Sequence, residues 1–161
     1  MLLDAIDQVN GTTTQFRGMP QGARAVQLQD MGGVDSYFLQ VFGRPSGGSA
    51  CECERTGDTS LAQSLHLLNS GEVYDKLQNG LARSLGSADD KRIDREKITD
   101  LYFAALSRAP VEPEIRTSIK YIETALAPRE GDDRPEAEKR QRAYEDLLWA
   151  LVNTKEFLFN H

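Results

Sequence analysis

The hydrophobic residues of this chain follow a helical period from about residue 60 to the end. Leu61, Leu65 and Leu68 stand at i, i+4 and i+7, and a second segment repeats this spacing up to Gly86. Apolar residues three and four positions apart lie on one face of an α-helix. This pattern predicts about five amphipathic helices. The apolar stripe of the first is Leu61, Leu65 and Leu68. The stripes of the other four are Val73, Leu77 and Leu81; Ile98, Leu101, Tyr102, Ala105 and Leu106; Ile115, Ile119, Ile122 and Leu126; and Tyr144, Leu147, Leu148, Leu151 and Val152.

Capping and turn residues indicate where these helices begin and end. Asp94 is the expected N-cap of the third helix, because a carboxylate there accepts a hydrogen bond from a free backbone N–H. Gly86 predicts the end of the helix before it. Pro110 ends the third helix, because proline disfavours helical geometry in the residue before it. Pro113 suits the first turn of the fourth helix.

The first 59 residues show no sustained period. Residues 10–60 hold nine of the 13 glycines, separated by short apolar stretches, so we read residues 1–59 as a loop-rich segment. Helices with one apolar face must bury those faces against each other. We therefore predict a mainly α fold, in which a bundle of about five amphipathic helices over residues 60–161 carries an irregular Gly-rich N-terminal layer. The length of 161 residues predicts a single domain over residues 1–161.

Within the predicted bundle, Leu101 and Leu148 sit in the middle of their stripes and are expected in the core. Trp149 is expected to pack there too, rather than to offer a platform for a sugar. The apolar run Phe157-Leu158-Phe159 lies close to the C-terminus, and leaving it in water would be costly. We expect at least two of these three side chains to be buried.

Composition and charge exclude several classes of protein. The 19 basic and 25 acidic residues give a net charge of −6, the wrong sign for a nucleic-acid-binding surface. The chain lacks the run of about 18 apolar residues that a membrane-spanning helix needs. The N-terminus has no basic region followed by an apolar one, so we expect no signal peptide within this chain. It is either a cytoplasmic protein or a piece of a longer exported chain whose signal peptide lies upstream.

The basic residues of the first 60 positions are all arginines, and they are candidate binding residues. Guanidinium groups pair with carboxylates through two parallel hydrogen bonds. We favour internal ion pairs with acidic neighbours such as Glu52 and Glu54 over an external anion site. The four arginines are Arg17, Arg24, Arg44 and Arg55.

Cys51 and Cys53 form the sharpest local motif. In an extended segment both sulfurs project to the same side, so with His66 they could hold a metal ion, and His161 is the other available imidazole. The spacing matches no zinc pattern, and two inert thiols or a disulfide are the alternatives. No metal ion is therefore expected.

Acid–base chemistry is a second possible use of the same region. Glu52 and Glu54 could act as an acid/base pair if burial separated their pKa values, and His66 lies on a polar helix face that could bind a ligand. Structural carboxylates and a solvated face are the commoner outcomes. The chain has no nucleophile elbow, phosphate-binding loop, dinucleotide-binding glycines or zinc-protease helix. We therefore expect no catalytic residues.

Several segments resemble a known family. They are residues 10–28 (NGTTTQFRGMPQGARAVQL), 36–45, 51–55, 60–70, 101–110 (LYFAALSRAP) and 145–161 (EDLLWALVNTKEFLFNH). In this order they resemble the C-terminal region of uncharacterised planctomycete proteins, which are built from domains of unknown function and are often associated with a cytochrome c domain. The LYFAALSRAP helix followed by NTKEFLF is also similar to helical linker-type modules that assemble proteins.

The resemblance implies large exported proteins with several domains and no agreed catalytic residues. It implies an extracytoplasmic location, and partners that are other domains of the same polypeptide or other proteins. No cofactor is expected in this domain, and haem is expected only in an associated domain or partner. The sequence thus predicts a non-catalytic interaction or assembly domain. The alternative is part of an enzyme or a redox or metal unit that uses Cys51, Cys53 and His66.

Overall fold

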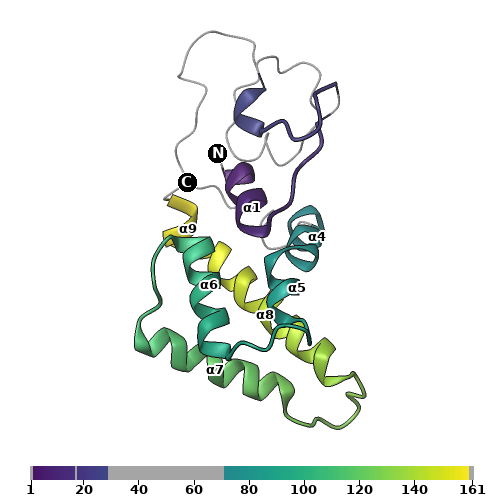
Figure 1. Cartoon of the computed structure of the whole chain (residues 1–161), viewed down its shortest axis with the longest axis vertical. Coiled ribbons are helices and arrows are strands. Elements are labelled where there is room, and N and C mark those ends of the chain that lie inside the picture. Colours follow the sequence, from purple (N-terminus) through teal and green to yellow (C-terminus); the bar gives the residue numbers. More distant parts are fainter. Residues whose placement is uncertain (1, 17, 29–70, 160–161) are drawn as a thin grey trace.

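The computed structural model describes residues 2–16, 18–28 and 71–159, and within these ranges the chain is helical without strands (Figure 1). The mainly α fold class is confirmed. The helices are α1 (Leu2–Asn10), a short 3-10 helix η1 (Ala25–Gln27), α4 (Gly71–Asn79), α5 (Leu81–Gly86), α6 (Asp94–Leu106), α7 (Glu112–Leu126), α8 (Glu136–Val152) and α9 (Lys155–Phe159). The helix predicted around residues 61–68 lies outside the described residues.

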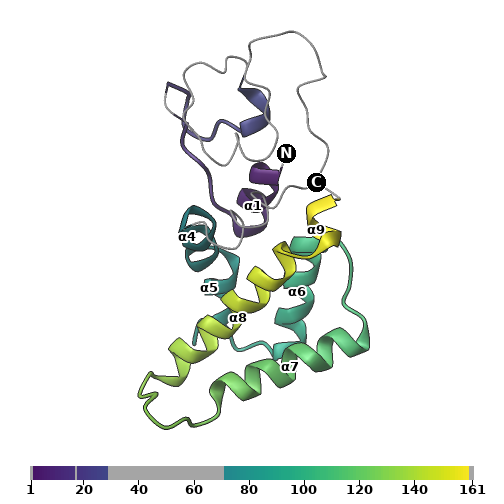
Figure 2. The same ribbon diagram turned by 180° about the vertical axis from the view of Figure 1, so that it is seen from behind.

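Helix α8 is the centre of the bundle. It runs diagonally across the molecule and contacts α4, α5, α6, α7 and α9 (Figures 1 and 2). Its residue Leu148 is fully buried, and Leu101 of α6 is only 1% exposed, so both expected core positions are confirmed. Trp149 packs half-buried against the same core.

The loop-rich reading of residues 1–59 is wrong for the first ten residues. Leu3, Ile6 and Val9 lie on one buried face of α1, which packs against α4 and α5. The carboxylates of Asp4 and Asp7 on α1 form hydrogen bonds with the segment that follows the helix. Asp4 accepts hydrogen bonds from the backbone N–H groups of Ala25 and Val26, at 2.6 and 3.1 Å.

The second of these carboxylates, on Asp7, also ties the N-terminal segment to the helical bundle. It accepts hydrogen bonds from the backbone N–H and the hydroxyl of Thr14, at 2.9 and 2.6 Å. It also forms an ion pair with Lys76 of α4, and both side chains of that pair are mostly buried. The N-terminal segment is therefore held by polar contacts as well as by its apolar residues.

Two glycines allow the backbone to approach closely where larger residues would not fit. The stripe from Val73 to Gly86 predicted one helix, but the structure has two, which meet at Gly80. A Cβ at Gly80 would lie 2.4 Å from the carbonyl oxygen of Asn10, the last residue of α1. A Cβ at Gly86 would lie 2.5 Å from the Cα of Gln141 on α8. Tertiary packing thus divides the predicted helix and explains the close contact between α5 and α8.

The expected N-cap of α6 is corrected by the structure. The N-cap is Ile93, and Asp94 is the first helical residue. The Asp94 carboxylate instead accepts hydrogen bonds from Arg140 at 2.9 Å and from the Tyr144 hydroxyl at 2.7 Å. It therefore joins α6 to α8. Pro113 lies in the first turn of α7, as predicted.

The turns that precede α6 and α8 share one arrangement, which we call the aspartate–arginine–lysine clasp. Before α6, Arg92 Nε donates to Asp90 Oδ1 at 3.0 Å, and Lys97 Nζ donates to the Asp90 carbonyl at 2.8 Å. Before α8, the corresponding bonds join Arg134 to Asp132 at 2.8 Å and Lys139 to the Asp132 carbonyl at 3.0 Å. Both lysines are at least nine-tenths buried.

The spacing along the chain from Asp90 to Asp132 also relates further residues of α6 and α7 to residues of α8 and α9. Tyr102 corresponds to Tyr144, and Glu114 to Glu156. The two glutamates bind the same guanidinium, that of Arg108. The chain from Asp90 onward is therefore built from two related helical units, which meet at Arg108.

The C-terminal segment folds back onto the core. Helix α8 ends at Val152, and the Thr154 hydroxyl accepts a hydrogen bond from the backbone N–H of Phe157 at 3.2 Å. Phe157 is fully buried and Leu158 is half-buried, while the side chain of Phe159 lies outside the described residues. Of the at least two side chains expected to be buried in this run, Phe157 is buried completely and Leu158 partly.

No helix in the described ranges combines the length and the apolar character that crossing a membrane requires.

Candidate functional site

Most of the residues that the sequence singled out lie outside the described residues. These are Arg17, Arg44, Cys51, Glu52, Cys53, Glu54, Arg55, His66 and His161. Arg24 is described: its side chain is exposed, and its backbone N–H donates to Gln27 Oε1 at 2.9 Å. Within the described ranges, no group of three or more His, Cys, Asp or Glu side chains could hold a metal ion.

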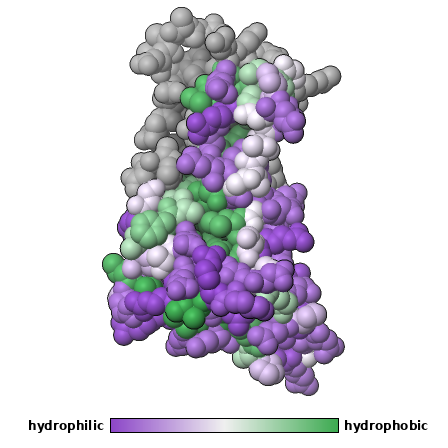
Figure 3. All heavy atoms as spheres, viewed as in Figure 1, coloured by the Kyte–Doolittle hydropathy of each residue, from purple (hydrophilic) through white to green (hydrophobic). Residues whose placement is uncertain are grey.

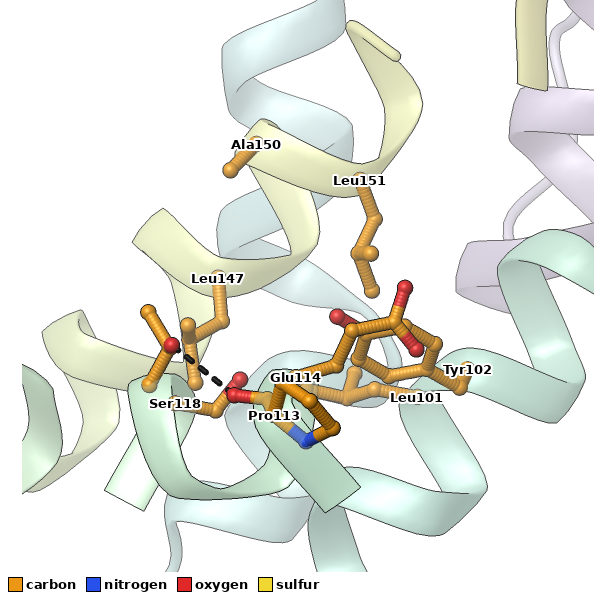
Figure 4. Close-up of a pocket in the computed structure, with 9 residues that line it drawn as sticks. Leu101, Tyr102, Pro113, Glu114, Ser118, Leu147, Ala150 and Leu151 are labelled. Atoms are coloured by element: carbon orange, nitrogen blue, oxygen red, sulfur yellow. Dashed lines mark hydrogen bonds between the residues drawn. The ribbon is translucent and has the colours of Figure 1, made fainter. Parts of the chain in front are cut away.

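A largely apolar pocket lies between α6, α7 and α8. Its volume is about 340 Å³, within the usual range for ligand pockets of roughly 300–1,000 Å³. Figure 4 shows residues of α8 facing residues of α6 and α7 across it. The lining residues are Leu101 and Tyr102 of α6; Pro113, Glu114, Thr117 and Ser118 of α7; and Leu147, Ala150 and Leu151 of α8. We call this the interhelical pocket.

The interhelical pocket is lined by residues that differ in how deeply they are buried. Leu101 and Tyr102 are at least nine-tenths buried at its base, whereas Ala150 is exposed at its rim. On the face drawn in Figure 3, hydrophobic residues reach the surface in patches among hydrophilic ones. The pocket therefore provides a concave apolar surface that is open to a partner.

Two polar residues of the pocket wall, Glu114 and Thr117, already have hydrogen-bond partners within the chain. The Glu114 carboxylate binds Arg108, and it also accepts a hydrogen bond from the backbone N–H of Val111 at 2.8 Å. The Thr117 hydroxyl donates to the Pro113 carbonyl at 2.9 Å, the dashed line in Figure 4. Burial raises the pKa of the Tyr102 hydroxyl, and the neighbouring Ser118 acts in the opposite direction.

Arg108 connects the pocket wall to the C-terminal helix. Its Nη2 donates to Glu114 at 2.9 Å, and its Nε donates to Glu156 of α9 at 2.7 Å. Its guanidinium also lies 5.5 Å from the centre of the Tyr102 ring, within the range of a cation–π contact. The hydrogen bonds from Arg108 lower the pKa values of both Glu114 and Glu156.

These lowered pKa values predict how Arg108 contributes to stability at different pH. A carboxylate whose pKa is depressed in the folded state contributes stability above its unfolded pKa, and this contribution is lost as the pH falls through the folded pKa. We therefore expect Arg108→Gln to lower the denaturation midpoint at neutral pH. This deficit should shrink as the pH falls below the ordinary glutamate pKa of about 4.3, because the glutamates become protonated.

Urea denaturation of both proteins across this pH range measures the deficit. Arg116→Gln is the matched control, because Arg116 is exposed on the same helix as Glu114. If the denaturation midpoint of Arg108→Gln stays below that of the wild type by the same amount at all pH values, including those below the glutamate pKa, the assignment of both carboxylates to Arg108 is contradicted.

A second group of titratable side chains, on the α6–α8 contact, is buried too deeply to be a site. Lys97 is 2% exposed and its Nζ lies 5.8 Å from the centre of the Tyr144 ring. Burial, followed by the hydrogen bond to Asp94, raises the pKa of Tyr144 well above its usual range. Tyr144 is fully buried, so these groups orient α6 against α8 rather than meet a ligand.

Sequence reasoning did not identify the interhelical pocket. The helical stripes placed Leu101, Tyr102, Leu147 and Leu151 on apolar faces, but a stripe indicates burial and not an incomplete filling of the space between helices. No sequence signal marks the pocket, because the exposure of the small residue Ala150 beside apolar positions of α8 is known only from the structure.

Comparison with known proteins assigns the chain to a family. Residues 6–122 match the family model PSD1, described as a protein of unknown function (DUF1553). This range includes α6 and most of α7, which supply two walls of the interhelical pocket. No curated protein and no solved structure matches the chain. Since the family model covers well over half of the sequence, the chain belongs to the DUF1553 family of proteins of unknown function.

Proposed function

We propose that this chain is a non-catalytic interaction domain, which receives one large apolar side chain of a partner polypeptide in the interhelical pocket. The observation that carries this proposal is the combination of an open apolar pocket with wall groups that are already hydrogen-bonded. Glu114 is bound to Arg108, and the Thr117 hydroxyl to the Pro113 carbonyl. The rest of the lining is mainly apolar, with Leu101, Leu147 and Leu151 among its residues, and suits an apolar occupant.

The same combination favours a polypeptide partner over a free small molecule. Small-molecule sites use a few convergent polar groups to fix the orientation of the ligand. The polar groups of this wall serve the chain itself, so they leave the orientation of a small molecule open. An apolar side chain is oriented by the polypeptide that carries it, and such anchors dominate the affinity of many protein interfaces.

We further propose that the domain belongs to a larger extracytoplasmic protein and contacts other domains of that protein, or a separate protein partner. The likeness of residues 10–28 and 145–161 to planctomycete proteins associated with cytochrome c domains supports this context. Any haem would then lie in the associated domain or partner. The full-length gene tests this proposal: a signal peptide and further domains upstream would support it, and a complete cytoplasmic reading frame of this length would contradict it.

Titration with capped single residues tests the pocket directly. We expect N-acetyl-leucinamide and N-acetyl-phenylalaninamide to shift the NMR signals of Leu101, Ser118 and Ala150, and N-acetyl-serinamide not to do so. Binding should be weak, with a Kd on the order of 10 mM, because burying one such side chain is worth only about 1.5–3 kcal/mol.

Ala150→Trp should abolish these shifts by placing an indole at the rim of the pocket. Ala137→Trp is the matched control, since Ala137 is exposed on the first turn of the same helix. Equal shifts in wild type and Ala150→Trp, or shifts with the serine compound alone, would overturn the proposal.

A further inference from the structure

A second cleft, of different chemistry, lies along α8 between α4, α7 and the loop that precedes α8. Its volume is about 200 Å³, below the usual range for drug-sized ligands, so it has room for only a small one. Its lining is mostly polar and aromatic, unlike that of the interhelical pocket. The side chains that matter here are Tyr74 of α4, Tyr121 of α7, Arg129 of the loop, and Arg142, Glu145 and Asp146 of α8.

Two tyrosine rings are exposed in this cleft. Tyr74 is 49% exposed and Tyr121 is 40% exposed, although large aromatic side chains of a stable domain usually lose most of their surface to packing. The Tyr121 hydroxyl donates to Asp146 Oδ2 at 2.6 Å. Burial of part of the ring and this hydrogen bond raise the pKa of Tyr121 to about 12, so the donor stays protonated at neutral pH. Both rings therefore offer apolar faces beside polar groups.

Charged side chains of both signs share the cleft and retain hydrogen-bonding capacity. Arg142 pairs with Glu138 at 3.5 Å, and Arg129 donates one hydrogen bond, to the Thr124 carbonyl, at 3.3 Å. Glu145 is 7% exposed and accepts a hydrogen bond from Gln141 at 2.8 Å. A guanidinium has five donors and a carboxylate about four acceptor positions, so each of these groups can bind a further partner.

We propose that this cleft binds a neutral saccharide. A simple anion would meet the carboxylates Glu145 and Asp146, and a simple cation would meet the guanidinium groups of Arg129 and Arg142. A sugar hydroxyl both donates and accepts hydrogen bonds, so it suits acceptors and donors placed side by side. The apolar face of a sugar ring suits the exposed tyrosine faces. This site is separate from the interhelical pocket and does not depend on the function proposed for it.

NMR titration of the whole chain with D-glucose, D-galactose and D-mannose tests the proposal. We expect at least one of them to shift signals of Tyr74, Tyr121 and Arg142, with a Kd on the order of 1 mM or above. Replacing either tyrosine by alanine should weaken this binding by about three- to tenfold. Tyr74→Phe should retain most of the affinity, because it keeps the ring.

Arg116→Ala is the matched control, because Arg116 is exposed on α7 but does not line the cleft. Titrations with acetate, methylammonium and D-glucuronate separate the alternatives. The proposal is overturned if no neutral sugar shifts these signals, if only the charged compounds do, or if the tyrosine-to-alanine variants bind the sugar as the wild type does.

Discussion

Replacing Phe157 by alanine is expected to lower the free energy of unfolding by about 3–5 kcal/mol. Phe157 is fully buried, although it lies in the five-residue helix α9 near the end of the chain. Its ring packs in the core cluster, and removing it would leave a cavity that the neighbouring helices can fill only in part. Equilibrium denaturation in urea measures the loss.

Phe103→Ala is the matched control for this change. Phe103 is 52% exposed on α6, so its replacement should cost within about 0.5 kcal/mol. A loss at Phe157 no larger than the loss at Phe103 would show that α9 does not pack into the core in solution. The ion pair between Arg108 and Glu156 of α9 would then have to be reassigned as well.

Leu148→Ala is expected to cost about 2–5 kcal/mol, a large share of the roughly 5–15 kcal/mol that stabilise a typical domain. Leu148 is fully buried on α8, the helix that contacts all its neighbours in the bundle. Leu101→Ala on α6 should give a loss in the same range, since Leu101 is 1% exposed. Both can be measured by the same urea denaturation.

An exposed aliphatic residue provides the comparison for these two leucines. Val111 is 56% exposed at the N-cap of α7, so Val111→Ala should change stability within about 0.5 kcal/mol. Losses below 0.5 kcal/mol at both Leu101 and Leu148 would contradict the packing of α6 against α8.

The helical stripes were enough to predict the helices from α6 to α8 and their core positions. This succeeded because burial of one face imposes the same spacing wherever a helix packs on a core. Helix α1, with its apolar residues Leu3, Ile6 and Val9, is only nine residues long and leads into a glycine-rich segment, so its sequence alone does not distinguish it from a loop. Short helices depend on tertiary contacts more than on their own sequence.

The errors at helix boundaries also have tertiary causes. The break at Gly80 arises because the backbone of Asn10 lies against it, and no neighbour of Gly80 in the sequence signals that contact. Asp94 is a residue type that favours the N-cap position, but its carboxylate accepts hydrogen bonds from Arg140 and Tyr144 of α8. Helix and capping propensities describe the local preference of a residue. At Gly80 and Asp94, contacts with residues distant in the sequence override that preference.

The sequence also carries a signal of internal repetition. The aspartate–arginine–lysine clasp recurs at a constant offset, as Asp90 to Lys97 and as Asp132 to Lys139. Fixed offsets of this kind are the usual mark of repeated structural units. The interhelical pocket and the cleft beside Tyr74 and Tyr121 had no comparable signal, because each is lined by three or more elements whose arrangement only the fold determines.

Selection of peptides from a random library, displayed against this domain, tests the central claim most directly. The claim is that the interhelical pocket binds an apolar side chain of a polypeptide. We expect the selected peptides to share one large apolar residue, and to lose binding to Ala150→Trp while keeping it for Ala137→Trp. Peptides that bind Ala150→Trp as tightly as the wild type, or that share no apolar anchor, would contradict the account.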